Sequence, residues 1–210
     1  THATATGRVN QKLRTRRALI EAAKELVAAG ATPTLAEVAD HAGVSKTTAY
    51  RYFASADDLI GEAYFDSDFP DADKVLAEAG PDPTDRVVAV ALAVSDMLLG
   101  HERAMRVILR NALDQSLESG DGAMRFGRRR RLIDAALQPL HGKLTKRQLA
   151  HLKDALALVI GPESIIAARD VSGLTPEAAS RLTAWAAQAL VEKAIAEAGG
   201  SPRSRAGAAG

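Results

Sequence analysis

The chain has 210 residues, of which 47% are hydrophobic and only 4% aromatic, so it can form one or two domains around an aliphatic, alanine-rich core. It contains no cysteine, which excludes disulfide bonds and cysteine-based metal sites. No apolar run approaches the length of a membrane span and the N-terminus lacks a signal-peptide core, so we expect a soluble, cytoplasmic protein without a membrane partner.

The net charge of +1 is unevenly distributed along the chain. Residues 1–56 carry eight basic and four acidic residues, a net charge of +4, whereas the remaining residues have a net charge of −3. A basic segment of this kind is typical of a surface that binds a polyanion.

Residues 1–14 show no apolar periodicity and end in basic residues, so we expect a flexible basic arm. Its Arg8, Lys12 and Arg14 either are solvated or contact a nucleic-acid backbone or minor groove. A first helix should begin at Thr15, carry one apolar stripe and end at Gly30.

Residues 34–53 have the pattern of a helix-turn-helix. Thr34 and Glu37 form a capping box at the start of one helix, and Gly43 ends that helix because glycine accepts a left-handed conformation at low cost. Ser45 then caps a second helix, whose inner face is Ala49 and Phe53.

The outer residues of this second helix suit a DNA major groove. Threonines are short enough to reach base edges, whereas lysine, arginine and tyrosine can hold phosphates. Together with the two helix starts, the candidate DNA-binding residues are Thr34, Ser45, Lys46, Thr47, Thr48, Tyr50, Arg51 and Tyr52.

Residues 15–65 resemble the DNA-binding domain of the TetR family of bacterial transcriptional regulators. The chain departs from the family pattern at Ala54, Ala56 and Thr47, and Thr47 adds a side chain where glycine is common. The resemblance implies a helix-turn-helix domain over residues 15–56, no enzymatic activity, and a homodimeric repressor that binds a palindromic operator in double-stranded DNA and is released by a small-molecule effector. The shared positions are Thr34, Val38, Ala39, Ala42, Gly43, Val44, Ser45, Thr48, Tyr50, Tyr52, Phe53, Ser55, Asp58 and Leu59.

After this domain the chain reads as successive helices, which makes the predicted fold all-α with about nine helices. Ser55 should cap a fourth helix that ends or kinks at Pro70, and Thr84 should cap a buried fifth helix. Residues 57–198 are expected to form a helical ligand-binding and dimerisation domain, followed by a disordered tail over residues 199–210.

Aromatic, methionine and polar residues in this second domain are candidates for an effector site. At helical spacing such residues are commonly core, but the helices of a TetR-like fold surround an effector cavity. The candidate ligand-binding residues are Phe65, Phe69, Met97, Met105, Asn111, Gln115, Met124, Phe126 and Glu163.

The last two predicted helices are apolar on wide faces and rich in alanine, so one protomer cannot cover both. A two-fold partner would complete a four-helix bundle. Residues 161–179 also resemble the dimer region of many TetR-like regulators. The candidate interface residues are Leu152, Leu156, Val159, Leu182, Trp185, Ala186, Ala189 and Leu190.

Other charged groups in the second domain indicate no chemistry. The arginine run over residues 125–131 points in several directions around a helix, which favours a solvated face over an anionic-effector site. The histidines lack metal-ligand spacing and no serine, aspartate or lysine has a catalytic context, so we expect no cofactor and no metal.

Three alternatives remain open from the sequence. Within DNA binding, the protein could be an activator or a regulator without a ligand. In a different class, it could be an α-helical small-molecule binding protein or enzyme that merely contains this helix pair. Salt-dependent binding to a palindrome separates these classes, because a ligand-binding protein would show no operator preference.

Overall fold

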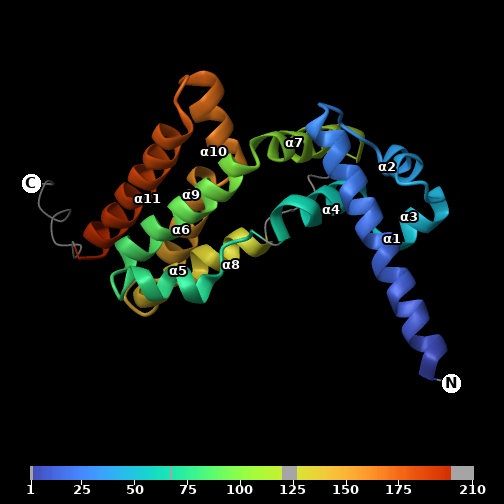
Figure 1. Ribbon diagram of the computed structural model, residues 1–210. Helices are drawn as coiled ribbons and strands as arrows, with labels where there is room; N and C mark the ends of the chain where they lie inside the picture. The colour runs from blue at the N-terminus through green and yellow to red at the C-terminus, as the bar shows by residue number, and fades with distance from the viewer. Residues whose placement is uncertain (1, 67, 120–126, 200–210) are drawn as a thin grey trace, which may run out of the picture. The chain divides into compact units, whose positions relative to one another are not determined.

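The computed structural model describes residues 2–66, 68–119 and 127–199, and within these ranges it contains no β-strand. The all-α prediction is confirmed, with eleven α-helices in the described residues instead of about nine (Figure 1). Short π-helical segments cover Glu62–Asp66 and Ala167–Val171, and a 3-10 turn covers Gln138–Leu140. The α-helices are α1 His2–Ala28, α2 Leu35–His41, α3 Lys46–Tyr52, α4 Ala56–Gly61, α5 Ala72–Ala79, α6 Pro83–Gly100, α7 Glu102–Ser119, α8 Gly127–Ala136, α9 Lys146–Val159, α10 Pro162–Ile166 and α11 Pro176–Gly199.

The two additional helices arise where proline divides a predicted helix. After Pro70, the side chain of Asp71 accepts a hydrogen bond from the amide of Asp73 at 3.0 Å, which starts α5 as a separate helix. Gly161 and Pro162 separate α9 from α10, since proline has no N–H to donate to the preceding turn.

The chain forms two compact units whose boundary differs from the one expected at residue 56. One unit contains residues 1–69 and 101–123, and the other contains residues 70–100 and 124–210. Leu59 of α4 is fully buried in the same core as Leu19, Val38 and Phe53. Both α4 and α7 therefore belong to the unit that carries the helix-turn-helix.

Within the first unit, α1 begins earlier than the sequence predicts. The expected cap Thr15 lies inside the helix, and its hydroxyl donates to the carbonyl of Gln11 at 3.1 Å. Residues 2–14 thus continue α1 and are not the irregular arm expected there. The predicted end is close, because α1 finishes at Ala28 and Gly30 adopts a positive φ of 97°.

Within the second unit, α6 packs along α11, and both also contact the shorter helix α10 (Figure 1). Val87, Val90 and Val94 of α6 are buried, as are Ala187 and Val191 of α11. Small residues on α11 allow this close packing, so part of the apolar face of α11 that was expected to need a partner is covered within the protomer.

The cap of α6 is Asp82 and not the predicted Thr84. The Asp82 carboxylate accepts hydrogen bonds from the amides of Thr84 at 2.7 Å and Asp85 at 3.2 Å. These bonds lower the pKa of Asp82. Arg86 then donates to the carbonyls of Ala135 and Ala136, which satisfies the C-terminal end of α8.

One member of the arginine run, Arg129, is buried rather than solvated. Its Nη1 lies 3.0 Å from Oε2 of Glu163, and its guanidinium group sits against the backbone of Gly161. A Cβ atom at position 161 would lie 1.5 Å from Nη1 and 2.7 Å from Cζ of Arg129. Gly161 is therefore needed for space, since its φ of 166° is open to any residue.

We expect Gly161→Ala to destabilise the protein by about 1–3 kcal/mol, because the new methyl group displaces a buried, ion-paired guanidinium. Thermal unfolding checks this result. Gly100→Ala is the matched control, because a Cβ atom there meets nothing within 4 Å. An unchanged melting temperature for Gly161→Ala would show that Arg129 does not occupy this position.

Three further sequence expectations concern the C-terminal tail, membrane spans and metal sites. The tail expected over residues 199–210 lies, after Gly199, outside the described residues. Among the described helices, none combines the length and the apolar character needed to cross a membrane. The described residues also contain no cluster of three or more histidine or acidic side chains that could hold a metal ion.

Candidate DNA-binding surface

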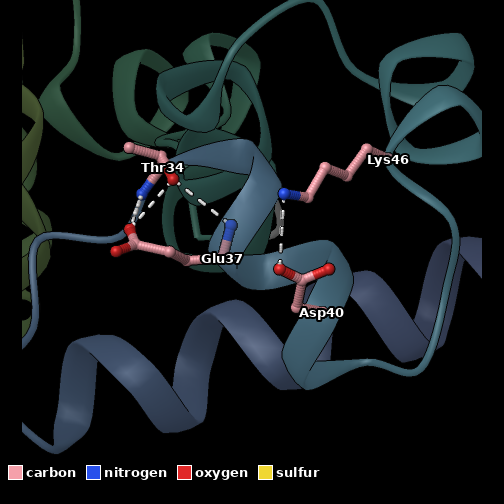
Figure 2. Close-up of polar contacts among 4 residues, drawn as sticks. All are labelled: Thr34, Glu37, Asp40 and Lys46. Atoms are coloured by element: carbon pink, nitrogen blue, oxygen red, sulfur yellow. Dashed lines mark hydrogen bonds and ion pairs between the residues drawn. The ribbon is translucent and has the colours of Figure 1, made fainter.

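The helix-turn-helix is built by local hydrogen bonds that the sequence predicts. Thr34 and Glu37 form the capping box of α2: the amide of Thr34 donates to Oε2 of Glu37 at 2.7 Å, and the amide of Glu37 donates to the threonine hydroxyl at 3.2 Å (Figure 2). Gly43 takes a left-handed φ of 64° in the turn. The Ser45 hydroxyl accepts from the amide of Thr48 at 3.2 Å and so starts α3.

The buried face of α3 fixes which side chains point outward. Ala49 is fully buried and Phe53, which follows the helix, is 4% exposed. The opposite face presents Lys46, Thr47 and Arg51 as exposed residues. The expected division between inner and outer positions of α3 therefore agrees with the structure.

Tyrosines and threonines of α3 differ in their freedom to reach a partner. Tyr50 is 58% exposed, whereas Tyr52 is half-buried. The ring centroid of Tyr52 lies 5.7 Å from the guanidinium carbon of Arg51. Thr47 is exposed, but the hydroxyl of Thr48 accepts a hydrogen bond from Ser45 at 2.8 Å. Tyr50 and Thr47 are thus the more accessible members of the predicted set.

Lys46 forms an ion pair that sequence reasoning missed. Its Nζ lies 3.6 Å from Oδ2 of Asp40, which is in the last turn of α2 (Figure 2). Both side chains are more than half exposed, so water and salt weaken this pair and a phosphate could replace the carboxylate. Because the two residues lie on different helices, no helical spacing rule identifies them.

Thr34 acts in the structure as a cap. Its hydroxyl donates to Oε2 of Glu37 at 2.9 Å while it accepts from the Glu37 amide. A DNA contact from this hydroxyl would have to replace the bond to Glu37, so its predicted role in DNA binding competes with its role in starting α2.

The capping box predicts a pH effect on stability. Hydrogen bonds from the backbone and hydroxyl of Thr34 lower the pKa of Glu37 below its ordinary value of 4.5. The stabilisation is therefore complete above that value and is lost as the pH falls through the lowered pKa. We expect wild type to lose more stability on acidification than Glu37→Gln, measured by urea unfolding across this range; parallel pH curves would contradict the assignment.

Arg16 of α1 contacts Phe53, which follows α3, and Glu62, which follows α4. Its guanidinium carbon lies 4.9 Å from the centroid of the Phe53 ring, and its Nε donates to Oε1 of Glu62 at 2.6 Å. Nearby, the hydroxyl of Tyr64 donates to the carbonyl of Lys24 at 3.1 Å. These contacts hold α1 against Phe53 and the π-helical segment Glu62–Asp66, and they engage the basic side chain of Arg16 in an ion pair.

The predicted effector residues that the structure describes are divided between the two units. Phe65 and Met105 are buried in the first unit, where Asn111 donates to Oδ1 of Asp57 at 2.7 Å. Glu163, in the second unit, pairs with Arg129. Of the others, Phe69 and Met97 are half-buried in the first and second units respectively, whereas Met124, Phe126 and the side chain of Gln115 lie outside the described residues.

The predicted dimer residues divide into buried and exposed sets. Leu152 and Leu156 of α9 are 3% and 0% exposed, so they belong to the core of their own protomer and are unavailable to a partner. Trp185 and Leu182 of α11 are 66% and 42% exposed. Ala189 is also exposed, and the remaining candidates Val159, Ala186 and Leu190 are half-buried.

A helix pair with a buried inner face and a basic, hydroxyl-bearing outer face defines a DNA-binding regulator of the helix-turn-helix class. Residues 19–63 match the family model of the bacterial regulatory proteins of the tetR family. The match identifies the N-terminal helix-turn-helix region as a DNA-binding domain of the tetR-family type.

No curated protein matches the sequence. A solved structure from Mesorhizobium loti, described as a candidate TetR-family transcriptional regulator, is 21% identical; the match covers 88% of this chain and 96% of that chain with a TM-score of 0.46. The tetR-family match is therefore confined to residues 19–63.

Proposed function

We propose that the protein is a homodimeric transcriptional repressor that binds a palindromic operator through α3 and catalyses no reaction. The observation that carries this proposal is the outer face of α3, where Lys46, Thr47, Tyr50 and Arg51 are exposed on a helix held by a buried Ala49. As a regulator of transcription it would act in the cytoplasm, where bacterial DNA lies.

Dimerisation is supported by an apolar stripe on α11. Leu182, Trp185 and Ala189 lie three and four residues apart, so they share one face of this helix, and all three are exposed. The opposite face, which includes Thr183 and Ala187, is buried against the protomer. A two-fold partner would cover the stripe and bring two recognition helices to a palindrome.

Effector control is supported by the position of α7. Asn111 of this helix contacts Asp57 at the start of α4, and Nη1 of Arg110 lies 3.4 Å from the hydroxyl of Thr32, just before α2. A ligand that displaces α7 would therefore disturb the helix-turn-helix directly. Screening small molecules for release of the operator tests this part of the proposal.

We expect Lys46 to supply affinity and Thr47 and Thr48 to supply sequence preference. Lys46→Ala should weaken binding to all sequences alike and lower the salt slope by about one unit, because one phosphate contact is lost. Thr47→Ala or Thr48→Ala should change the preferred bases. Selection from random duplexes measures both effects, and an identical consensus for all three variants would contradict this division.

A further inference from the structure

The strongest concentration of positive charge in the chain lies outside the helix-turn-helix. Residues 127–154 contain eight lysines and arginines against two aspartates, a net charge of +6, which exceeds the +4 of residues 1–56. This segment forms α8, the following turn and most of α9, and α8 packs against α9 (Figure 1). The proposed repressor function gives this charge no role.

Local carboxylates neutralise only part of the segment. Arg130 pairs with Asp154 at 2.7 Å, Lys153 pairs with Asp134, and the buried Arg129 pairs with Glu163. By contrast, the exposed side chains of Arg131, Lys146 and Arg147 form no ion pair with any residue that the structure describes.

Two of these charges lie where they destabilise the start of a helix. Lys146 and Arg147 occupy the first turn of α9, and this turn contains no acidic residue. The N-terminal end of a helix already carries partial positive charge, so cations there are unfavourable. Thr145 and Gln148 form a capping box at the start of α9, and this box uses a neutral glutamine where the equivalent box on α2 uses Glu37.

We propose that the α8–α9 surface, defined by Arg131, Lys146, Arg147, Arg130 and Lys153, binds the phosphate backbone of duplex DNA without sequence preference and separately from α3. This inference rests on the proposed function, because a repressor held at an operator meets neighbouring duplex at high effective concentration. Duplex DNA carries about one negative charge per 1.7 Å of axis, and releasing its counterions favours binding by an extended basic surface.

The form of the surface favours an extended polyanion over a small anion. The depression between α8 and α9 has a volume of about 310 Å³ and is lined by Arg130, Lys146 and Lys153, but Asp154, which pairs with Arg130, also lines it and offsets part of their charge, and neither Arg131 nor Arg147 lines it. The cations are instead spread over helices of 10 and 14 residues. Residues 127–154 contain no phenylalanine, tyrosine or tryptophan, so the surface lacks the large stacking platforms that single strands use.

The test measures binding of the full-length chain to a duplex of scrambled sequence as a function of salt. Lys146→Gln/Arg147→Gln should reduce the slope of log Kobs against log salt concentration by about two, because two phosphate contacts are lost. The matched control is Lys74→Gln/Lys193→Gln, which removes the same charge from exposed positions on α5 and α11 and should keep the wild-type slope.

A second background separates this surface from α3. In a Lys46→Ala/Arg51→Ala protein we expect residual duplex binding, which Lys146→Gln/Arg147→Gln then abolishes. Equal salt slopes for the α8–α9 variant and its control would overturn the proposal. Charge-dependent binding to poly-glutamate without binding to duplex DNA would also overturn it, because the partner of the surface would then be an acidic polypeptide. If the wild-type protein bound no operator in preference to the scrambled duplex, this result would instead contradict the repressor function alone.

Discussion

Tyr50→Ala is expected to weaken operator binding by at least about a hundredfold, because a hydrogen bond to a charged group contributes about 1.5–3 kcal/mol and a two-fold dimer loses two of them. The side chain is 58% exposed beside the buried Ala49, so its hydroxyl is free to reach a phosphate. Fluorescence anisotropy with a labelled operator at fixed salt measures the change.

The same variant should leave the fold intact. Exposed positions that are not caps or packed residues change stability by about 0.5 kcal/mol or less, so the melting temperature and dimer content of Tyr50→Ala should match wild type. Tyr50→Phe serves as the control for the hydroxyl and should lose most of the same affinity. Operator affinity that survives in both variants would remove Tyr50 from the contact surface.

Trp185→Glu is expected to dissociate the proposed dimer. The side chain is 66% exposed in the protomer, so a carboxylate there costs the isolated protomer little. In a two-fold interface each dimer would bury two unpaired carboxylates, and the dissociation constant should rise by about a hundredfold or more. Sedimentation over a range of protein concentrations checks this, together with the loss of binding to a two-site palindrome.

Two companion variants make this result specific. Leu182→Glu, three residues away on the same face of α11, should behave like Trp185→Glu. Ala77→Glu introduces the same charge at an exposed position of α5 and should remain dimeric. A folded Trp185→Glu protein that stays dimeric with full operator affinity would place the interface elsewhere, for example around Leu158, which is 77% exposed on α9.

The parts of the structure that could be predicted are those set by neighbouring residues. Thr34 with Glu37 and Thr145 with Gln148 form the capping boxes that their spacing indicates, and Gly43 takes the expected left-handed turn. Each of these features depends on hydrogen bonds within a few residues. The helix-turn-helix could therefore be recognised, and its outer face assigned, without knowledge of the remaining fold.

The parts that could not be predicted depend on contacts between distant segments. Leu156 of α9 resembles an interface residue in sequence, but packing within its own unit buries it completely. The assignment of α7 to the helix-turn-helix unit involves pairs such as Asn111 with Asp57, which are 54 positions apart. Arg129 is indistinguishable from its neighbouring arginines until Glu163 and Gly161 are placed beside it.

Selection of bound sequences from a pool of random duplexes tests the central claim most directly. If α3 of two protomers reads the operator, the selected sequences should share a palindrome whose half-sites lie about 34–36 Å apart, or adjust to that spacing when bound. Tyr50→Ala should enrich no sequence under the same conditions. A wild-type pool without any consensus, or a Tyr50→Ala pool with the same palindrome, would contradict the assignment of α3 as the operator-reading helix.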